Sequence, residues 1–329
     1  TAPPGSEDVA AVVVITDCDH GGVDPERAVL DSHDVELRVL DCRTPEEVAA
    51  QAGDADALIN QYVPITGAVL DALPRCRLVV RYGVGVDNVD VEAATGRGVW
   101  VANVPDYGRD EVADHTLALA LSLLRGVVVL DRSVRDGVWD LEAARPPRRL
   151  STLTWGVVGC GAIGRGVAGR AAGLGMRVLG HDLPGVRSEA PIERVALEEL
   201  LEGADVVSLH AALTPESHHL IGAGALARMR PTAFLVNTAR GGLVDAAALL
   251  DALEAGELAG AALDVLEEEP PDELGWRLAR HPRVVATPHA AWYSEEAFHT
   301  LKSEVAREAL RVLEGGEPRS PVNAPAALR

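Results

Sequence analysis

The sequence predicts an α/β protein of two Rossmann-like domains, each a doubly wound parallel sheet, with a cleft between the domains. Short β-branched runs alternate with helix-like segments roughly every 20–25 residues, which is typical of a parallel α/β sheet. A chain of 329 residues is long enough for two such sheets. Prolines at 146 and 147 separate one series of alternating segments from the next.

In the first series, four apolar runs have the length and composition of buried parallel strands. They span residues 10–16, 57–60, 77–82 and 99–104. Thr44 predicts a helix start, because Glu47 three residues later completes a capping box. The apolar periodicity over 111–134 predicts one long helix.

In the second series, six strand-like runs lie within 153–289 and predict a second doubly wound sheet. A final helix is expected over 294–314, with Gly315 and Gly316 as its C-terminal stop.

Composition excludes several classes of protein. A formal charge of −20 disfavours nucleic-acid binding, and no apolar run is long enough for a membrane span. The single lysine, Lys302, lies in an amphipathic pattern and is expected at the surface. The cysteines have no paired spacing, which favours reduced thiols in a cytoplasmic protein. The tandem His218-His219 is not expected to bind a metal, because adjacent side chains rarely converge on one ion.

A glycine-rich turn predicts a dinucleotide site. The turn comprises Gly159, Gly161, Ala162, Ile163 and Gly164, placed directly after a strand and at the start of a helix. Glycines at these positions let the backbone approach a pyrophosphate at the helix N-terminus. Asp182 ends the next strand, at the distance expected for a carboxylate that binds the ribose hydroxyls. This favours NAD over NADP, although Arg187 nearby leaves NADP open.

Three polar residues follow strands of the second sheet and predict hydride-transfer chemistry on a 2-keto acid. Arg240, Glu269 and His289 each stand at a strand end, where α/β sheets bind ligands. Arginine suits a substrate carboxylate, and histidine suits proton transfer near neutral pH. Glu269 would orient and stabilise the protonated imidazole.

The residues also resemble a known family, the D-isomer-specific 2-hydroxyacid dehydrogenases. The resemblance covers nearly the whole chain, and within the family it is nearest to the branch of the C-terminal-binding proteins. The motifs that carry it are GCGAIG (159–164), NTARGGLVD (237–245), ALDVLEEEP (262–270) and TPHAAW (287–292). RYGVGVDNVD (81–90) and the stretch 103–121 also match the family pattern.

The resemblance implies roles for individual residues. Arg240, Glu269 and His289 would be the substrate arginine, the supporting acid and the proton donor. The substrate would also meet Arg81, Tyr82, Gly83, Val84 and Trp292. The cofactor would further meet His210, Thr238, Ala239 and Asp264. Residues 1–105 with 294–329 would form a flavodoxin-like substrate domain, and 106–293 an NAD-binding domain whose arm around 125–150 forms a homodimer.

Three functions remain open at this point. The first is an NAD(H)-dependent reductase of small 2-keto acids, with no nucleic-acid or membrane partner. The second is an NAD(H)-sensing, corepressor-like interaction protein of the C-terminal-binding-protein type. The third is a reductase of a phosphorylated or phosphonate 2-keto acid, similar to 3-phosphoglycerate dehydrogenase. It would need a second cation, with Arg75, Arg109 and Arg148 as candidates.

Overall fold

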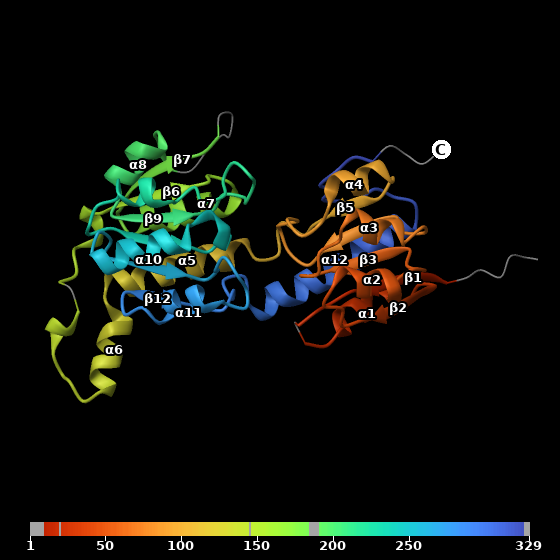
Figure 1. Cartoon of the computed structure of the whole chain (residues 1–329), viewed down its shortest axis with the longest axis horizontal. Helices are drawn as coiled ribbons and strands as arrows, with labels where there is room; N and C mark the ends of the chain where they lie inside the picture. The colour runs from red at the N-terminus through yellow and green to blue at the C-terminus, as the bar shows by residue number, and fades with distance from the viewer. Residues whose placement is uncertain (1–9, 20, 145, 184–190, 326–329) are drawn as a thin grey trace, which may run out of the picture. The chain divides into compact units, whose positions relative to one another are not determined.

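The computed structural model describes residues 10–19, 21–144, 146–183 and 191–325. The chain divides into two compact units. One contains residues 1–107 and 294–329, and the other contains residues 108–293. The division falls after residue 107, where the sequence predicts it after residue 105. Each unit is built on a parallel sheet, so the predicted α/β class with two doubly wound parallel sheets is confirmed (Figure 1).

The first unit has a five-stranded sheet in the order β2-β1-β3-β4-β5, which is the flavodoxin-like order. The strands are β1 (Ala11–Ile15), β2 (Val35–Val39), β3 (Ala57–Asn60), β4 (Leu78–Arg81) and β5 (Trp100–Ala102). Helices α2 (Pro45–Gln51), α3 (Gly67–Asp71) and α4 (Val91–Gly96) share one apolar core with this sheet. Helices α1 (Asp24–Leu30) and α12 (Glu295–Leu313) pack against each other, and α12 also packs against β3 and β4.

The capping box predicted at Thr44 is present in part. The Thr44 hydroxyl accepts a hydrogen bond from the Glu47 N–H at 3.3 Å, while the Glu47 carboxylate accepts from the N–H of Arg43. Strand β2 was missed by the sequence analysis. It lies at the sheet edge, and its alternating Glu36 and Arg38 interrupt the apolar run that marks the inner strands.

The second unit has a seven-stranded sheet in the order β12-β11-β10-β9-β6-β7-β8. The strands are β6 (Thr154–Val158), β7 (Arg177–His181), β8 (Glu193–Arg194), β9 (Val206–Leu209), β10 (Phe234–Asn237), β11 (Gly260–Leu263) and β12 (Val284–Ala286). The six predicted strands are present, and the two-residue β8 is an addition. The strand order reverses between β6 and β9, which is where doubly wound sheets bind ligands.

Helices cover both faces of this sheet. On one face lie α5 (Arg109–Leu124) and α7 (Ala162–Gly173). On the other lie α8 (Leu197–Gly203), α9 (Ala223–Leu226), α10 (Ala246–Ala255) and α11 (Glu273–Arg280). Among the described residues of this unit, short 3₁₀ turns lie at Leu141–Ala143, Leu150–Thr152 and Gly241–Leu243.

The single long helix predicted over 111–134 is wrong. The chain forms α5 and then a separate helix, α6 (Val127–Arg135). Gly126 interrupts them with a left-handed backbone (φ +64°), and a Cβ there would lie 2.7 Å from the Ala144 side chain. The apolar periodicity continues through Gly126, so the periodicity gave no sign that the helix ends there.

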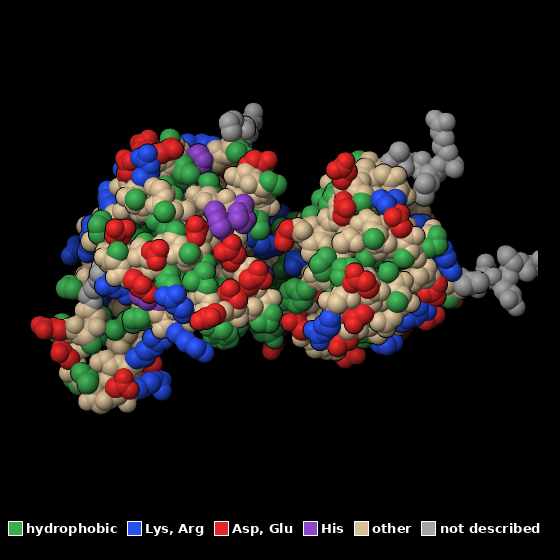
Figure 2. Space-filling view, viewed as in Figure 1, with side chains coloured by type: hydrophobic (Ala, Val, Ile, Leu, Met, Phe, Trp, Pro, Cys, Tyr) green, Lys and Arg blue, Asp and Glu red, His purple; other side chains and the backbone are tan. Residues whose placement is uncertain are grey.

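The surface position predicted for Lys302 is also wrong. Its side chain is fully buried on α12, and Nζ lies 3.2 Å from Glu26 on α1. The predicted end of α12 is confirmed, because the N–H of Gly315 and of Gly316 donate to carbonyls in the last turn. Acidic side chains are spread over the visible faces of both units (Figure 2). No helix among the described residues is long and apolar enough to cross a membrane.

Candidate active site

The glycine-rich turn between β6 and α7 has a specific need for each glycine. Gly159 has a left-handed backbone (φ +90°) that favours glycine. A Cβ on Gly164 would lie 2.0 Å from the Gly159 carbonyl oxygen, so this glycine lets the helix approach the strand. Gly161 caps α7, and a Cβ there would meet nothing within 4 Å. The turn therefore leaves open space beside the N–H groups at the start of a 12-residue helix, which fits a dinucleotide pyrophosphate.

Asp182 lies directly after β7, beside this turn. Its carboxylate accepts hydrogen bonds from the N–H of Cys160 at 2.6 Å and of Leu183 at 2.7 Å. These bonds hold a negative charge next to the turn, which fits the ribose end of a dinucleotide. Arg187, which left the choice between NAD and NADP open, lies outside the described residues.

His210 lies at the carboxyl end of β9, next to Gly159. Its Nε2 is 2.9 Å from the Ser208 hydroxyl, which also accepts from the indole N–H of the buried Trp155. Burial lowers the pKa of His210 to about 3, so the ring is neutral near pH 7. Nδ1 is buried and has no hydrogen-bond partner among the described residues.

Thr238 and Ala239 form a tight turn after β10. The Thr238 hydroxyl lies 2.7 Å from the hydroxyl of Thr116 on α5, so it already has a hydrogen-bond partner. The fully buried Asn237 accepts from the Ala239 N–H and donates to the Arg240 carbonyl. Asn237 was not predicted as a site residue, although a polar residue at the end of an apolar strand was a usable signal.

Glu269 and His289 form a hydrogen-bonded pair, as the sequence predicts. The Glu269 Oε2 lies 2.6 Å from the His289 Nδ1, and both side chains are about one-third exposed. Burial by itself would raise the pKa of Glu269, but the hydrogen bond and charge of His289, with the charge of Arg240, hold it below its usual value. The other oxygen of Glu269 accepts from the Leu266 N–H at 3.0 Å, which fixes the carboxylate.

Arg240 follows Ala239 at the end of the turn after β10 and is half-buried. Its guanidinium donates a hydrogen bond to the carbonyl of Ala239. It is near enough to act electrostatically on Glu269. The unit therefore brings together a cation, a carboxylate and an imidazole whose Nδ1 is held by that carboxylate.

Asp264 shapes the backbone around His289. Its buried carboxylate accepts from the N–H of Ala290, the N–H of Ala291 and the hydroxyl of Thr287, at 2.5–2.9 Å. Its carbonyl accepts from the His289 N–H at 2.7 Å. These bonds support the left-handed backbone of His289 (φ +52°), which is uncommon outside glycine.

The loop after β4 carries the candidates of the first unit. Gly83 has a positive φ of +134°, and a Cβ there would lie 1.9 Å from the Arg81 guanidinium. Among the described residues, the N–H groups of Gly83 and Val84 have no hydrogen-bond partner. Two such donors in sequence suit an anion.

The prediction that Tyr82 contacts substrate is not supported by its position. Its side chain is 2% exposed, and its hydroxyl donates to Glu26 at 2.5 Å. Its N–H donates to the Asn60 carbonyl. Tyr82 is therefore part of the core behind the loop.

Trp292 lies three residues after His289 and is half-buried. Its ring meets that of Tyr293 edge-on, with centroids 5.5 Å apart. A Cβ on Gly108 would lie 3.2 Å from the Trp292 carbonyl oxygen, so Gly108 lies close against this residue.

Two of the arginines considered for a phosphate form salt bridges with aspartates. Arg75 pairs with Asp56 at 2.6 Å, and Arg148 pairs with Asp205 at 2.6 Å. Arg109 is the first residue of α5.

The side chains of His218 and His219 lie together, which was not expected of adjacent residues. Their rings stack with centroids 3.9 Å apart, and His219 Nε2 lies 2.6 Å from the Glu267 carboxylate. One group of neighbouring histidine side chains is visible on this unit, and other histidines lie apart from it (Figure 2, purple).

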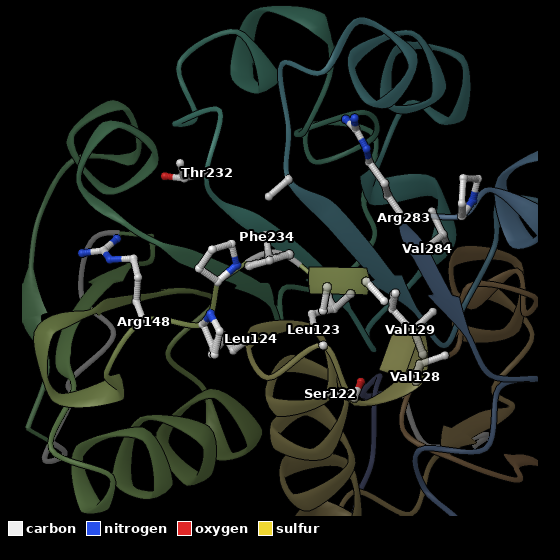
Figure 3. Close-up of a pocket in the computed structure, with 18 of the residues that line it drawn as sticks. Ser122, Leu123, Leu124, Val128, Val129, Arg148, Thr232, Phe234, Arg283 and Val284 are labelled. Atoms are coloured by element: carbon white, nitrogen blue, oxygen red, sulfur yellow. The ribbon is translucent and has the colours of Figure 1, made fainter. Parts of the chain in front are cut away.

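A separate groove lies beside α6, with a volume of about 570 Å³. Its walls are mostly apolar and come from the end of α5, from α6, and from β10 and β12 (Figure 3). Residues that line it include Leu123, Leu124, Val128, Val129, Phe234 and Val284. None of the predicted catalytic residues lines it.

Comparison with known proteins agrees with this geometry. Residues 117–291 match the family model described as D-isomer specific 2-hydroxyacid dehydrogenase, NAD binding domain. The fold and site thus define an NAD-binding, doubly wound oxidoreductase. The chain belongs to the D-isomer-specific 2-hydroxyacid dehydrogenase family.

Individual relatives carry different names. A glyoxylate reductase of Korarchaeum cryptofilum is 43% identical over 82% of this chain and 83% of its own. A D-3-phosphoglycerate dehydrogenase of Methanocaldococcus jannaschii is 38% identical over 88% of this chain but only 56% of its own. Among solved structures, D-lactate dehydrogenase from Aquifex aeolicus, complexed with NAD and lactic acid, has a TM-score of 0.87 at 28% identity. It covers 95% of this chain and 100% of its own.

Proposed function

We propose that this protein is an NAD(H)-dependent reductase of small 2-keto acids, producing D-2-hydroxy acids. The observation that carries the proposal is the pair of Glu269 and His289, 2.6 Å apart and close to Arg240. A carboxylate bonded to Nδ1 stabilises the imidazolium and leaves Nε2 to donate a proton.

In this proposal each residue has one task. Arg240 binds the substrate carboxylate through its planar guanidinium and polarises the adjacent carbonyl. His289 protonates the oxygen that becomes the hydroxyl, and Glu269 holds the ring in the donating orientation. NADH, when bound, supplies the hydride to the substrate 2-carbon. In the oxidative direction His289 accepts the proton instead.

In this proposal the loop after β4 is suited to an anion, and Trp292 to the apolar part of a substrate. The unpaired N–H groups of Gly83 and Val84 are suited to carboxylate oxygens, and Arg81 adds a positive charge beside them. Trp292 supplies an aromatic surface for the substrate side chain.

Asp182 favours NAD over NADP. A 2′-phosphate would lie against its carboxylate, whose oxygens already accept two backbone hydrogen bonds. The repulsion between the two anions would disfavour the phosphorylated cofactor.

The salt bridges of Arg75 and Arg148 occupy two of the three candidate cations for a phosphate, which supports an unphosphorylated substrate. Each guanidinium is paired with an aspartate at 2.6 Å, so neither is available to a phosphate without breaking that pair. The similarity to a protein named glyoxylate reductase also supports a short 2-keto acid.

We further propose a homodimer formed through residues 125–150. Helix α6 has no buried residue and exposes Val127, Val129 and Val134. Beyond it, Trp139 is 90% exposed and Leu141 is 84% exposed. An apolar arm beside an apolar groove suits a self-complementary contact with a second copy of the chain.

The test is the oxidation of NADH with a panel of 2-keto acids. The panel contains glyoxylate, pyruvate, 4-methylthio-2-oxobutyrate, phenylpyruvate, 3-phosphohydroxypyruvate and phosphonopyruvate. We expect turnover of one or more unphosphorylated acids, lowered about 10²- to 10⁴-fold by His289→Ala, which removes the general acid. The exposed His33 provides the control, and His33→Ala should keep the wild-type rate.

Two outcomes would contradict the proposal. Preferred turnover of 3-phosphohydroxypyruvate or phosphonopyruvate would assign a phosphorylated or phosphonate substrate. Tight NADH binding without turnover of any acid would favour an NAD(H)-sensing interaction protein.

A further inference from the structure

We propose that His218, His219 and Glu267 form a binding site for a borderline divalent cation such as Zn²⁺. One ligand atom from each residue lies within 4.8 Å of the others. The Glu267 Oε1 is 2.6 Å from His219 Nε2 and 3.9 Å from His218 Nε2. Two imidazoles and one carboxylate are a ligand set that Zn²⁺ accepts, with water completing a tetrahedron.

The backbone explains why adjacent histidines converge here. His219 has a left-handed conformation (φ +53°), which turns its side chain toward that of His218. The N–H of His219 donates to the Gly242 carbonyl at 2.8 Å, and that of Ile221 donates to the Leu243 carbonyl at 2.9 Å. The backbone that carries the two histidines is therefore fixed to the segment after Arg240 before any ion binds.

A second carboxylate lies near the outer nitrogen of His219, at ion-pair but not hydrogen-bond distance. Asp245 Oδ2 lies 3.9 Å from His219 Nδ1, the nitrogen that faces away from Glu267. Its other oxygen caps α10 by accepting from the Ala248 N–H, which fixes the side chain. A carboxylate on the outer nitrogen of a histidine is the usual support of a metal ligand.

Binding requires a small rearrangement. In a tetrahedral Zn²⁺ site the ligand atoms lie about 3.4 Å apart, so His219 and Glu267 must separate by about 0.8 Å. The two imidazole planes are only 24° apart, so one ring must turn to aim its lone pair at the ion. The His218 side chain is 53% exposed and has room for this rotation.

The test is titration of the chelator-treated protein, without an affinity tag, by Zn²⁺ in isothermal titration calorimetry. We expect one Zn²⁺ per chain at this site, lost in His218→Ala and in Glu267→Gln. Glutamine keeps a hydrogen-bond acceptor for His219 but removes the charge. Asp245→Asn keeps the helix cap and should weaken binding about 10- to 100-fold, as loss of a supporting carboxylate does.

Co²⁺ provides a second measurement that does not depend on enzyme activity. A nitrogen and oxygen site of four ligands should give visible absorption bands that disappear in His218→Ala. His33→Ala, which removes an exposed histidine of the other unit, should bind both ions as the wild type does. Wild-type stoichiometry in His218→Ala and Glu267→Gln, or no 1:1 binding by the wild type, would overturn the proposal.

Discussion

The charge of Glu269 is the property on which the proposed proton transfer depends. Glu269→Gln keeps the shape and an acceptor for His289 but cannot stabilise an imidazolium by charge. A hydrogen bond to a charged group contributes about 1.5–3 kcal/mol, so kcat should fall about 10- to 100-fold. KM for the 2-keto acid should change little, because Arg240 remains. Steady-state kinetics checks this, and an unchanged kcat would contradict the role given to Glu269.

The buried ion pair of Lys302 and Glu26 makes a prediction about stability. Lys302→Met should lower the free energy of unfolding by about 3–5 kcal/mol, because it leaves the Glu26 carboxylate buried without its cation. The double variant Lys302→Met/Glu26→Gln should recover most of this loss, since no buried charge remains. Urea unfolding of both variants is the measurement. If the double variant were as unstable as the single one, the destabilisation would come from altered packing around residue 302 and not from the unpaired charge of Glu26.

His210 makes a prediction about pH. Its pKa is about 3 in the folded protein, below the 6.5 of a free histidine, because burial disfavours the charged ring. Between pH 6.5 and 3 the unfolded chain therefore binds a proton that the folded protein does not. This contribution lowers stability as pH falls through that range. His210→Gln should lose less thermal stability than the wild type between pH 6.5 and 5. An equal loss of thermal stability in His210→Gln and the wild type would refute the lowered pKa of His210. His33→Gln, at an exposed histidine, is the control variant.

At the scale of the elements, the turn between β6 and α7 offers a matched pair of glycines. Gly161→Ala adds a methyl group where the structure has open space, so stability should be retained. NADH affinity should fall tenfold or more, because the methyl group occupies the place of the pyrophosphate. Gly164→Ala should lower both the stability and the affinity for NADH, because its methyl group collides with the Gly159 carbonyl.

The measurements for this pair are the melting temperature and the fluorescence of bound NADH. If Gly161→Ala bound NADH as the wild type does, the pyrophosphate would not lie at this turn.

The elements also show what sequence patterns can and cannot reveal. The inner strands were predicted because buried parallel strands are continuous apolar runs. The edge strand β2 was missed, because alternating charged residues hide such a run. The break between α5 and α6 was missed, because it depends on the contact between Gly126 and Ala144, which are 18 residues apart in the chain.

At the scale of the whole molecule, the exposed arm predicts association. The double variant Trp139→Ser/Leu141→Ser should convert a dimer into a monomer, because it removes the two most exposed large apolar side chains of residues 125–150. Light scattering after gel filtration measures this. Trp276→Ser, at an exposed tryptophan outside the arm, is the control and should remain a dimer. A wild-type monomer would refute the proposed arm contact.

The sequence by itself determined the fold class and the glycine-rich turn, and it predicted Arg240, Glu269 and His289 as the catalytic candidates. Each depends on local order along the chain: strand, turn and helix, or a polar residue at a strand end. Parallel strands bring their carboxyl ends to one edge of a sheet, so such residues meet without further information.

The tertiary structure alone decided which side chains remain available. Tyr82 was assigned to substrate but is buried against Glu26, and Lys302 was assigned to the surface but is buried beside the same carboxylate. The pairing of His219 with Glu267 joins residues 48 positions apart. Burial and backbone conformation depend on contacts between distant segments, and no local pattern in the chain encodes those contacts.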